Sequence, residues 1–210
     1  MSEARLREQI AEFGRSLFFR GYGCGSSGNI SVRLEDGILV TPTNSCMGLL
    51  DPARIAKVAW DGKHLDGDPP SKEAFLHLAM YEERPADKAV VHLHSTHSVA
   101  VSCLDGVDPE NVLPPITAYY VMKIGRLPLI PYYRPGDKSL AEAVRSMARD
   151  HHAMLLANHG PVVSGKALDA AVYAAEELEE TAKLYLLLGE RPVRCLTETQ
   201  MAELAEAFPS

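Results

Sequence analysis

The sequence contains no apolar run long enough to cross a membrane, which would take about 20 consecutive apolar residues. Its most apolar stretch, residues 89–104, is interrupted by three histidines and three serines. The first eight residues mix Glu3 and Glu8 with Arg5 and Arg7, which is unlike a signal peptide. We therefore expect a cytoplasmic protein with no membrane partner.

The sequence also has few cysteines and no surplus of positive charge. The four cysteines are scattered and form no CxxC pair, which favours reduced thiols over a disulfide framework: Cys24, Cys46, Cys103 and Cys195. The net charge of −7 argues against a nucleic-acid partner, although a small anion can still bind in a local basic pocket. Because no repeat and no Gly- or Ser-rich linker interrupts the 210 residues, we expect one domain over residues 1–210.

Hydrophobic spacing and turn residues predict a mixture of strands and helices. The apolar residues between Leu6 and Phe18 recur at helical spacing, and this helix should stop near Gly21. Further helices are predicted over residues 71–81, 95–104, 139–149, 168–185 and 198–207, and strands over 29–34, 38–41, 89–94, 127–131 and 153–157 and around 58. Hairpin signals among these elements predict a largely antiparallel sheet with helices packed on it.

The segment from Val90 to His94 carries the strongest chemical signal. On a strand, His92 and His94 point to the same side, and two imidazoles on a rigid element suit Zn²⁺, Mn²⁺ or Fe²⁺. The alternative is a pair of buried, hydrogen-bonded histidines. His159 lies where a predicted strand ends before a Gly160–Pro161 turn, so we expect it to be exposed there. Three such histidines would leave a fourth ligand position open, as in catalytic zinc sites.

The remaining histidines and the polar loops have plainer interpretations. His97 competes for a ligand position but should lie in the following helix and face elsewhere. The others lack partner spacing and are expected to be surface or structural residues: His64, His77, His151 and His152. The loop from Ser26 to Asn29 could aim N–H groups at an anion, as could Ser71 at a helix N-terminus. Taken alone, however, these stretches are a turn and an N-cap.

Five short motifs occur in an order that resembles the class II aldolase/adducin family. They are Ser26-Ser27-Gly28-Asn29-Ile30-Ser31, Thr41-Pro42-Thr43, Ser71-Lys72-Glu73, His92-Leu93-His94 and Asn158-His159-Gly160. The resemblance spans residues 6–188. It implies a three-layer α-β-α sandwich with a central, mainly antiparallel sheet, and a homotetramer with active sites at subunit interfaces.

The resemblance also implies roles for particular residues. His92, His94 and His159 would bind the metal, and Glu73 would approach it and serve as acid/base. Without the resemblance, Glu73 would be read as a helix-start residue favoured by the macrodipole. The substrate phosphate would be bound by the matching loop residues: Gly28, Asn29, Thr43, Asn44, Ser71 and Lys72. The expected ion is Zn²⁺, with Mn²⁺, Fe²⁺ or Co²⁺ as alternatives.

Within this family, the chain resembles the members that decarboxylate 3-oxo-tetronate 4-phosphates. Residues 20–22, 92–96, 102–106, 131–137 and 176–183 carry the likeness, and Tyr132-Tyr133-Arg134-Pro135-Gly136-Asp137 is the most distinctive run. The implied reaction loses CO₂, passes through an enediolate stabilised by the metal, and yields dihydroxyacetone phosphate. Arg134 is a candidate for binding the substrate carboxylate, because arginine can hold it with two hydrogen bonds. The alternative is a solvated loop arginine.

Other reactions of the family remain alternatives. A sugar-phosphate aldolase of the fuculose-phosphate type would often use a tyrosine near the C-terminus, and residues 194–210 contain none. A 4-epimerase would need a further acid and tyrosine. A non-catalytic adducin-like scaffold would have lost some of the metal-binding residues. Four tyrosines could donate hydrogen bonds at the open edge of the site: Tyr119, Tyr120, Tyr132 and Tyr133. The alternative is that they only pack against neighbouring side chains.

Overall fold

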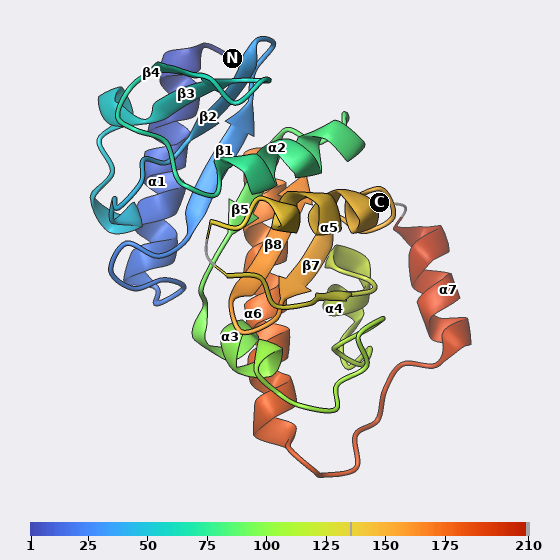
Figure 1. Ribbon diagram of the computed structural model, residues 1–210. Coiled ribbons are helices and arrows are strands. Elements are labelled where there is room, and N and C mark those ends of the chain that lie inside the picture. The colour runs from blue at the N-terminus through green and yellow to red at the C-terminus, as the bar shows by residue number, and fades with distance from the viewer. Residues whose placement is uncertain (135, 209–210) are drawn as a thin grey trace.

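The computed structural model describes residues 1–134 and 136–208, and an eight-stranded sheet forms its centre (Figure 1). The strand order is β4-β3-β2-β1-β5-β8-β7-β6. The strands are β1 (Asn29–Arg33), β2 (Gly37–Val40), β3 (Ala56–Ala59), β4 (His64–Asp66), β5 (Ala89–His92), β6 (Leu129–Ile130), β7 (Ala153–Leu156) and β8 (Gly160–Gly165). Only the β6–β7 pair is parallel in the described part of the chain, so the predicted mainly antiparallel sheet is confirmed.

Helices cover both faces of this sheet. They are α1 (Glu3–Phe19), α2 (Ala74–Glu83), α3 (Thr96–Ser102), α4 (Ala118–Lys123), α5 (Ser139–Ala148), α6 (Leu168–Leu188) and α7 (Glu198–Ala207). The buried residues of α1, α3, α4 and α6 share one core, and those of α2 and α5 share another on the opposite face. Figure 1 shows α2 and α5 in front of the sheet and α6 behind it. The α-β-α sandwich is therefore also confirmed.

Strand β5 shows how the sheet positions the site. Its alternate side chains enter the two cores: Ala89 and Val91 face α6, and Val90 faces α2. All three are fully buried, and burying a valine side chain stabilises the fold by about 1.5–3 kcal/mol. By the same alternation, His92 lies on the Val90 side, where α2 begins. The apolar residues thus fix the direction of the imidazole.

Several predicted boundaries differ from the structure, and three differences bear on the site. The strand predicted over residues 89–94 ends at His92, so His94 lies beyond it. The helix expected from Ser71 begins at Ala74, and Glu73 is its N-cap residue. Residues 71–73 form a turn instead, because the Ala74 N–H donates to the Ser71 carbonyl oxygen (3.1 Å) and the Glu73 N–H to Ser71 Oγ (3.2 Å). Glu73 therefore precedes the helix, where its side chain can reach the end of β5.

The expected turn at Gly160–Pro161 is also wrong, because both residues begin β8. The chain turns one step earlier, through Asn158, whose φ of 55° is left-handed. Gly160 has a φ of 155°, and a Cβ there would collide with the Leu93 carbonyl oxygen, so the strand can pass His94 only with glycine at this position. The sequence interpretation missed β4, β8 and α4 altogether.

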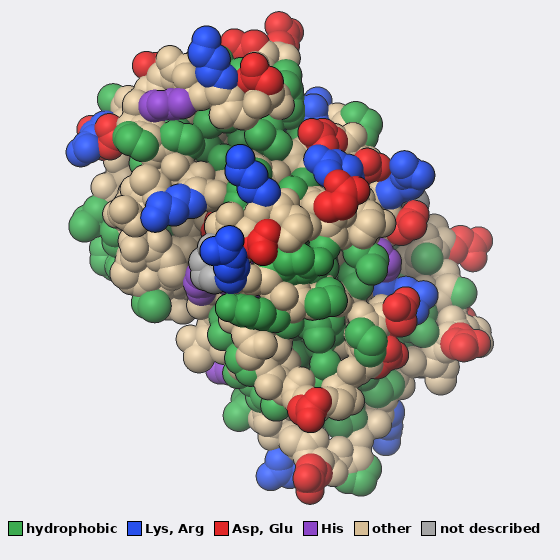
Figure 2. All heavy atoms as spheres, viewed as in Figure 1, with side chains coloured by type: hydrophobic (Ala, Val, Ile, Leu, Met, Phe, Trp, Pro, Cys, Tyr) green, Lys and Arg blue, Asp and Glu red, His purple; other side chains and the backbone are tan. Residues whose placement is uncertain are grey.

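The visible face carries Lys, Arg, Asp and Glu side chains in a mixed pattern (Figure 2). Within the described residues, no helix is both long and apolar enough to span a bilayer.

Candidate metal centre and active-site cleft

Four side chains from distant parts of the sequence converge at one edge of the sheet. They are Glu73, His92, His94 and His159, and one ligand atom from each lies within 4.8 Å of all the others. The three imidazole ring centroids are 4.7–4.9 Å apart. His92 ends β5, His94 follows two residues later, and His159 lies in the turn between β7 and β8. The three histidines and the glutamate predicted from sequence are therefore brought together.

The backbone of β8 fixes the orientation of His92. Its Nδ1–H donates to the Pro161 carbonyl oxygen at 2.9 Å, and the same oxygen accepts the Leu93 N–H at 3.2 Å. The unprotonated Nε2 of His92 then faces Nε2 of His94 at 3.0 Å. This carbonyl-to-histidine contact is a common way in which proteins orient a metal ligand.

The charges of the cluster suit a cation. Burial lowers the pKa of His94 to about 3 and lowers that of His92 as well, so both rings are neutral at pH 7. Burial alone would raise the pKa of Glu73, but the neighbouring His92 and hydrogen bonds from His159 and Asn29 outweigh it and hold the pKa below its ordinary value. Neutral imidazoles and an ionised carboxylate are the ligand forms that a divalent metal requires. The donor set therefore fits such an ion.

A buried carboxylate on α6 fixes the segment that follows His94. Glu179 accepts the backbone N–H groups of His97 and Ser98, each at 2.8 Å, at the start of α3. His97 Nδ1 also contacts Glu179 at 2.8 Å. His97 therefore faces α6 and not the cluster, as predicted.

The cluster lies in a cleft of about 590 Å³. Asn158, Tyr132 and Tyr133 line it together with Glu73, His94 and His159. The other two candidate tyrosines do not line this cleft: Tyr120 is fully buried, and Tyr119 is largely exposed elsewhere. The Tyr132–Tyr133 pair thus provides the aromatic wall of the cleft.

The loops predicted to bind phosphate lie side by side next to Glu73. Backbone bonds from Thr43 N–H to Pro69 O (2.9 Å) and from Ser71 N–H to Thr41 O (3.1 Å) join them. Asn44 lies in the same loop with a left-handed φ of 56°. Gly28 packs so closely on the β5 end that a Cβ would lie 2.9 Å from the His92 carbonyl oxygen.

Two members of that predicted set differ in environment. Asn29 is buried, and its Nδ2 donates to Glu73 Oε2 at 2.8 Å, so this amide is directed at the acid/base candidate. Lys72 is exposed. The structure thus brings Asn29 into the metal cluster and leaves the Lys72 side chain in solvent.

Arg134, the candidate for the substrate carboxylate, lies on the loop that follows the two cleft tyrosines. Its side chain is 82% exposed, and Nε lies 3.9 Å from Asp137. The guanidinium is not among the groups that line the cleft. Pro135, in the same motif, lies outside the described residues.

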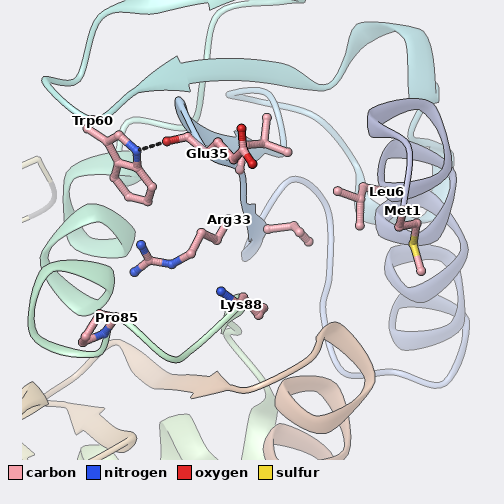
Figure 3. A pocket seen from close by; sticks show the side chains of 9 residues that line it. Met1, Leu6, Arg33, Glu35, Trp60, Pro85 and Lys88 are labelled. Atoms are coloured by element: carbon pink, nitrogen blue, oxygen red, sulfur yellow. Dashed lines mark hydrogen bonds between the residues drawn. The ribbon is translucent and has the colours of Figure 1, made fainter.

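A second cavity, of about 720 Å³, lies away from the histidines, between α1 and the end of α2 (Figure 3). Arg33 reaches into it with its guanidinium carbon 4.7 Å from the ring centroids of Trp60 and Tyr81. Arg33 donates to the Tyr81 carbonyl oxygen, and Trp60 Nε1–H to that of Glu35. These groups are already paired within the protein, so this cavity is the weaker candidate for chemistry.

Sequence reasoning missed one buried residue that contacts the site. His77 was expected to be a surface or structural residue, but it is fully buried and contacts Asn29 Oδ1 through Nε2. The available signal was its position four residues after Glu73, which places the two on one side of the α2 N-terminus.

Known proteins match the chain over almost its whole length. The description "Class II Aldolase and Adducin N-terminal domain" matches residues 8–186. The 3-oxo-tetronate 4-phosphate decarboxylase of Escherichia coli strain K12 is 56% identical over 203 residues, which cover 96% of each chain. The L-fuculose phosphate aldolase of that strain is 34% identical over 212 residues, which cover 99% of this chain and 96% of the aldolase.

A solved structure agrees with the match. The crystal structure of YgbL from Escherichia coli superposes with a TM-score of 0.94 at 55% identity, over 96% of this chain and 98% of that one. The ordered motifs, the sandwich fold and these matches lead to the same assignment. This chain belongs to the class II aldolase/adducin family.

Proposed function

We propose that this chain is a lyase that removes the carboxylate of a 3-oxo-tetronate 4-phosphate as CO₂ and releases dihydroxyacetone phosphate. The observation that carries this function is the near-full-length match to a decarboxylase at 56% identity, against 34% for the aldolase. The intact Glu73, His92, His94 and His159 cluster argues against a non-catalytic scaffold.

The proposed cofactor is Zn²⁺, held by the three histidines. Three protein ligands and one open position are the pattern of catalytic zinc sites, and Mn²⁺, Fe²⁺ or Co²⁺ would accept the same donors. When bound, the ion supplies Lewis acidity towards the oxygens of the substrate. The family and the donor set support a divalent metal; its identity is our proposal.

Glu73 is the proposed proton donor. When the C1–C2 bond breaks, CO₂ leaves without the bonding electrons, which flow into the neighbouring ketone. C2 must then gain one proton to become the hydroxymethyl carbon of the product. Glu73 lines the cleft, where it can take a proton from solvent and deliver it to C2.

The two anionic ends of the substrate need separate partners. We assign the phosphate to Gly28, Asn29, Thr43, Asn44, Ser71 and Lys72, whose loops are joined beside Glu73. We assign the carboxylate to Arg134, which would have to turn towards the cleft to contact it. The lysine at position 72 adds a positive charge for a doubly anionic substrate.

We further propose a cytoplasmic homotetramer whose cleft is completed by a neighbouring subunit. Tyr132 lines the cleft yet is 61% exposed, which leaves an aromatic surface for a partner chain to cover. Light scattering should give four chains per particle. A stable, active monomer would contradict this assembly.

Decarboxylation in D₂O provides the decisive test. The zinc-loaded protein should release CO₂ and dihydroxyacetone phosphate in equal amounts, with one deuterium on the hydroxymethyl carbon. An enzyme-held acid such as Glu73 should place it on one face only. Failure to release CO₂, together with cleavage of a sugar phosphate to dihydroxyacetone phosphate and an aldehyde, would establish the aldolase alternative.

A further inference from the structure

A chain of hydrogen bonds runs from Glu73 into the interior between β1 and α2. Asn29 Nδ2 donates to Glu73 Oε2 at 2.8 Å, and Asn29 Oδ1 contacts His77 Nε2. His77 Nδ1 lies 2.7 Å from Ser31 Oγ, which lies 2.9 Å from the Tyr81 hydroxyl. His77 and Ser31 are fully buried, Tyr81 is 1% exposed and Asn29 is 4% exposed.

The ionised carboxylate sets the direction of every bond in this chain. A carboxylate only accepts, so Asn29 must turn its amino group to Glu73 and its Oδ1 to His77. That oxygen also only accepts, so His77 must carry its proton on Nε2. The Nδ1 lone pair of His77 then accepts the Ser31 O–H, and the Ser31 oxygen accepts the Tyr81 O–H.

We propose that His77 is a positioning residue for the reaction. Its Nε2–H tautomer locks the Asn29 amide with the amino group towards Glu73. A flipped amide would place its oxygen against the carboxylate and repel it. Burial and the Ser31 hydrogen bond prevent the His77 ring from turning to permit the flip.

The fixed orientation of the Asn29 amide matters because few other contacts restrain the Glu73 side chain. Glu73 makes no side-chain hydrogen bond to the helix that it caps. Its Oε1 lies 3.2 Å from His159 Nε2, and its Oε2 depends on Asn29, with His92 Nε2 at 3.5 Å. Without the lock, the carboxylate would lose its alignment with the reacting carbon while the three histidines stayed in place.

The first test is the tautomer of His77 in ¹⁵N-histidine-labelled, zinc-loaded protein at neutral pH. The His77 signals, assigned by their loss in His77→Gln, should show a protonated Nε2 and an unprotonated Nδ1. An Nδ1–H tautomer, or a mixture of the two, would overturn the proposal. Ser31→Ala removes the donor to Nδ1 and should allow a mixture to form.

The second test compares two substitutions at position 77. His77→Leu should lower kcat by about 10- to 100-fold, the usual effect of removing a group that orients a metal-site residue. KM and zinc content should stay near the wild-type values. His77→Gln keeps an N–H close to the position of Nε2 and should recover most of the lost kcat.

Equal losses of kcat in the Leu and Gln variants would overturn the proposal, because His77 would then only fill space. If His77→Leu does not fold, the Gln variant and the tautomer still decide the question. The kcat comparison rests on the proposed decarboxylation, whereas the tautomer does not. Wild-type protein with the Nε2–H tautomer but no decarboxylase activity would therefore count against the function alone.

Discussion

The histidine-lined cleft and the larger cavity beside Arg33 differ in how their polar side chains are paired. In the larger cavity, Arg33 and Trp60 donate to backbone carbonyl oxygens of neighbouring loops and helix ends. In the histidine-lined cleft, Nε2 of His92 and Nε2 of His94 face each other at 3.0 Å with the Glu73 carboxylate beside them. Arg33 and Trp60 are thus paired with the protein's own backbone in one cavity, whereas the polar groups of the cleft are directed at a common point.

This difference teaches that polar groups directed at one point locate the site better than cavity volume does. Grouping neutral imidazole nitrogens in a buried place costs free energy unless a cation or proton joins them. The protein nevertheless holds them there through rigid elements, the end of β5 and the β7–β8 turn. The following substitutions test the contrast between the two cavities.

The largest effect is expected for His94→Ala, which removes one of three proposed metal ligands. Bound metal should fall from about one ion per chain to a small fraction, and kcat by more than the roughly 100-fold that loss of a merely supporting group costs. His97→Ala, three residues away but paired with Glu179, is the control and should keep its metal. Metal analysis after gel filtration gives the answer; full metal content in His94→Ala would contradict the ligand set.

Glu73→Gln should have the next largest effect. The amide keeps the size of the side chain but cannot deliver a proton, so kcat should fall by roughly 10²-fold or more with the fold intact. Glu82→Gln, on the exposed side of α2, should leave kcat unchanged. Steady-state kinetics with circular dichroism checks both variants. Near-normal turnover in Glu73→Gln would mean that Glu73 has a structural role only.

Arg134→Met tests whether the exposed loop binds the substrate carboxylate. Loss of a charge-assisted contact of about 1.5–3 kcal/mol should lower kcat/KM by roughly 10- to 150-fold. Inhibition by dihydroxyacetone phosphate, which lacks a carboxylate, should change little. Arg149→Met, another exposed arginine, serves as the control. If product inhibition weakens as much as kcat/KM falls, Arg134 binds phosphate or supports the loop instead.

Local patterns in the sequence were enough to predict much of this cleft. Alternation along a strand predicted that His92 and His94 point to the same side. The two imidazoles do converge, although β5 ends at His92 and His94 lies two residues beyond it. His159 was proposed as a third ligand from its place at a predicted strand end. The family resemblance added Glu73, which no residue spacing connects to the histidines. The decarboxylase function, predicted from the same resemblance, agrees with the relatives found.

What the sequence did not reveal depends on long-range packing. Pro161 suggested a turn because proline lacks an N–H, yet β8 uses its carbonyl oxygen, which accepts from His92 and Leu93. His77 had no visible partner because Asn29 reaches it only when β1 and α2 pack together. The residue spacing within one helix or strand cannot predict either contact, because each contact joins two different elements.

The smallest effect is expected in the larger cavity, for Trp60→Phe. Phenylalanine keeps a ring beside Arg33 but loses the Nε1–H bond to the Glu35 carbonyl oxygen, which is 3.0 Å long. The free energy of unfolding should fall by about 0.5–1.5 kcal/mol, the net contribution of one such hydrogen bond. Because the Trp60 indole donates to protein and not to a ligand, kcat/KM should stay at the wild-type value. Urea unfolding at fixed protein concentration, alongside kinetics, separates the two outcomes.

The Trp60 ring lies 6.1 Å from that of Tyr81, the far end of the His77 hydrogen-bond chain. A fall in kcat without a loss of stability would therefore show that this cavity is coupled to the cleft through Tyr81, and the separation of the two cavities would be wrong.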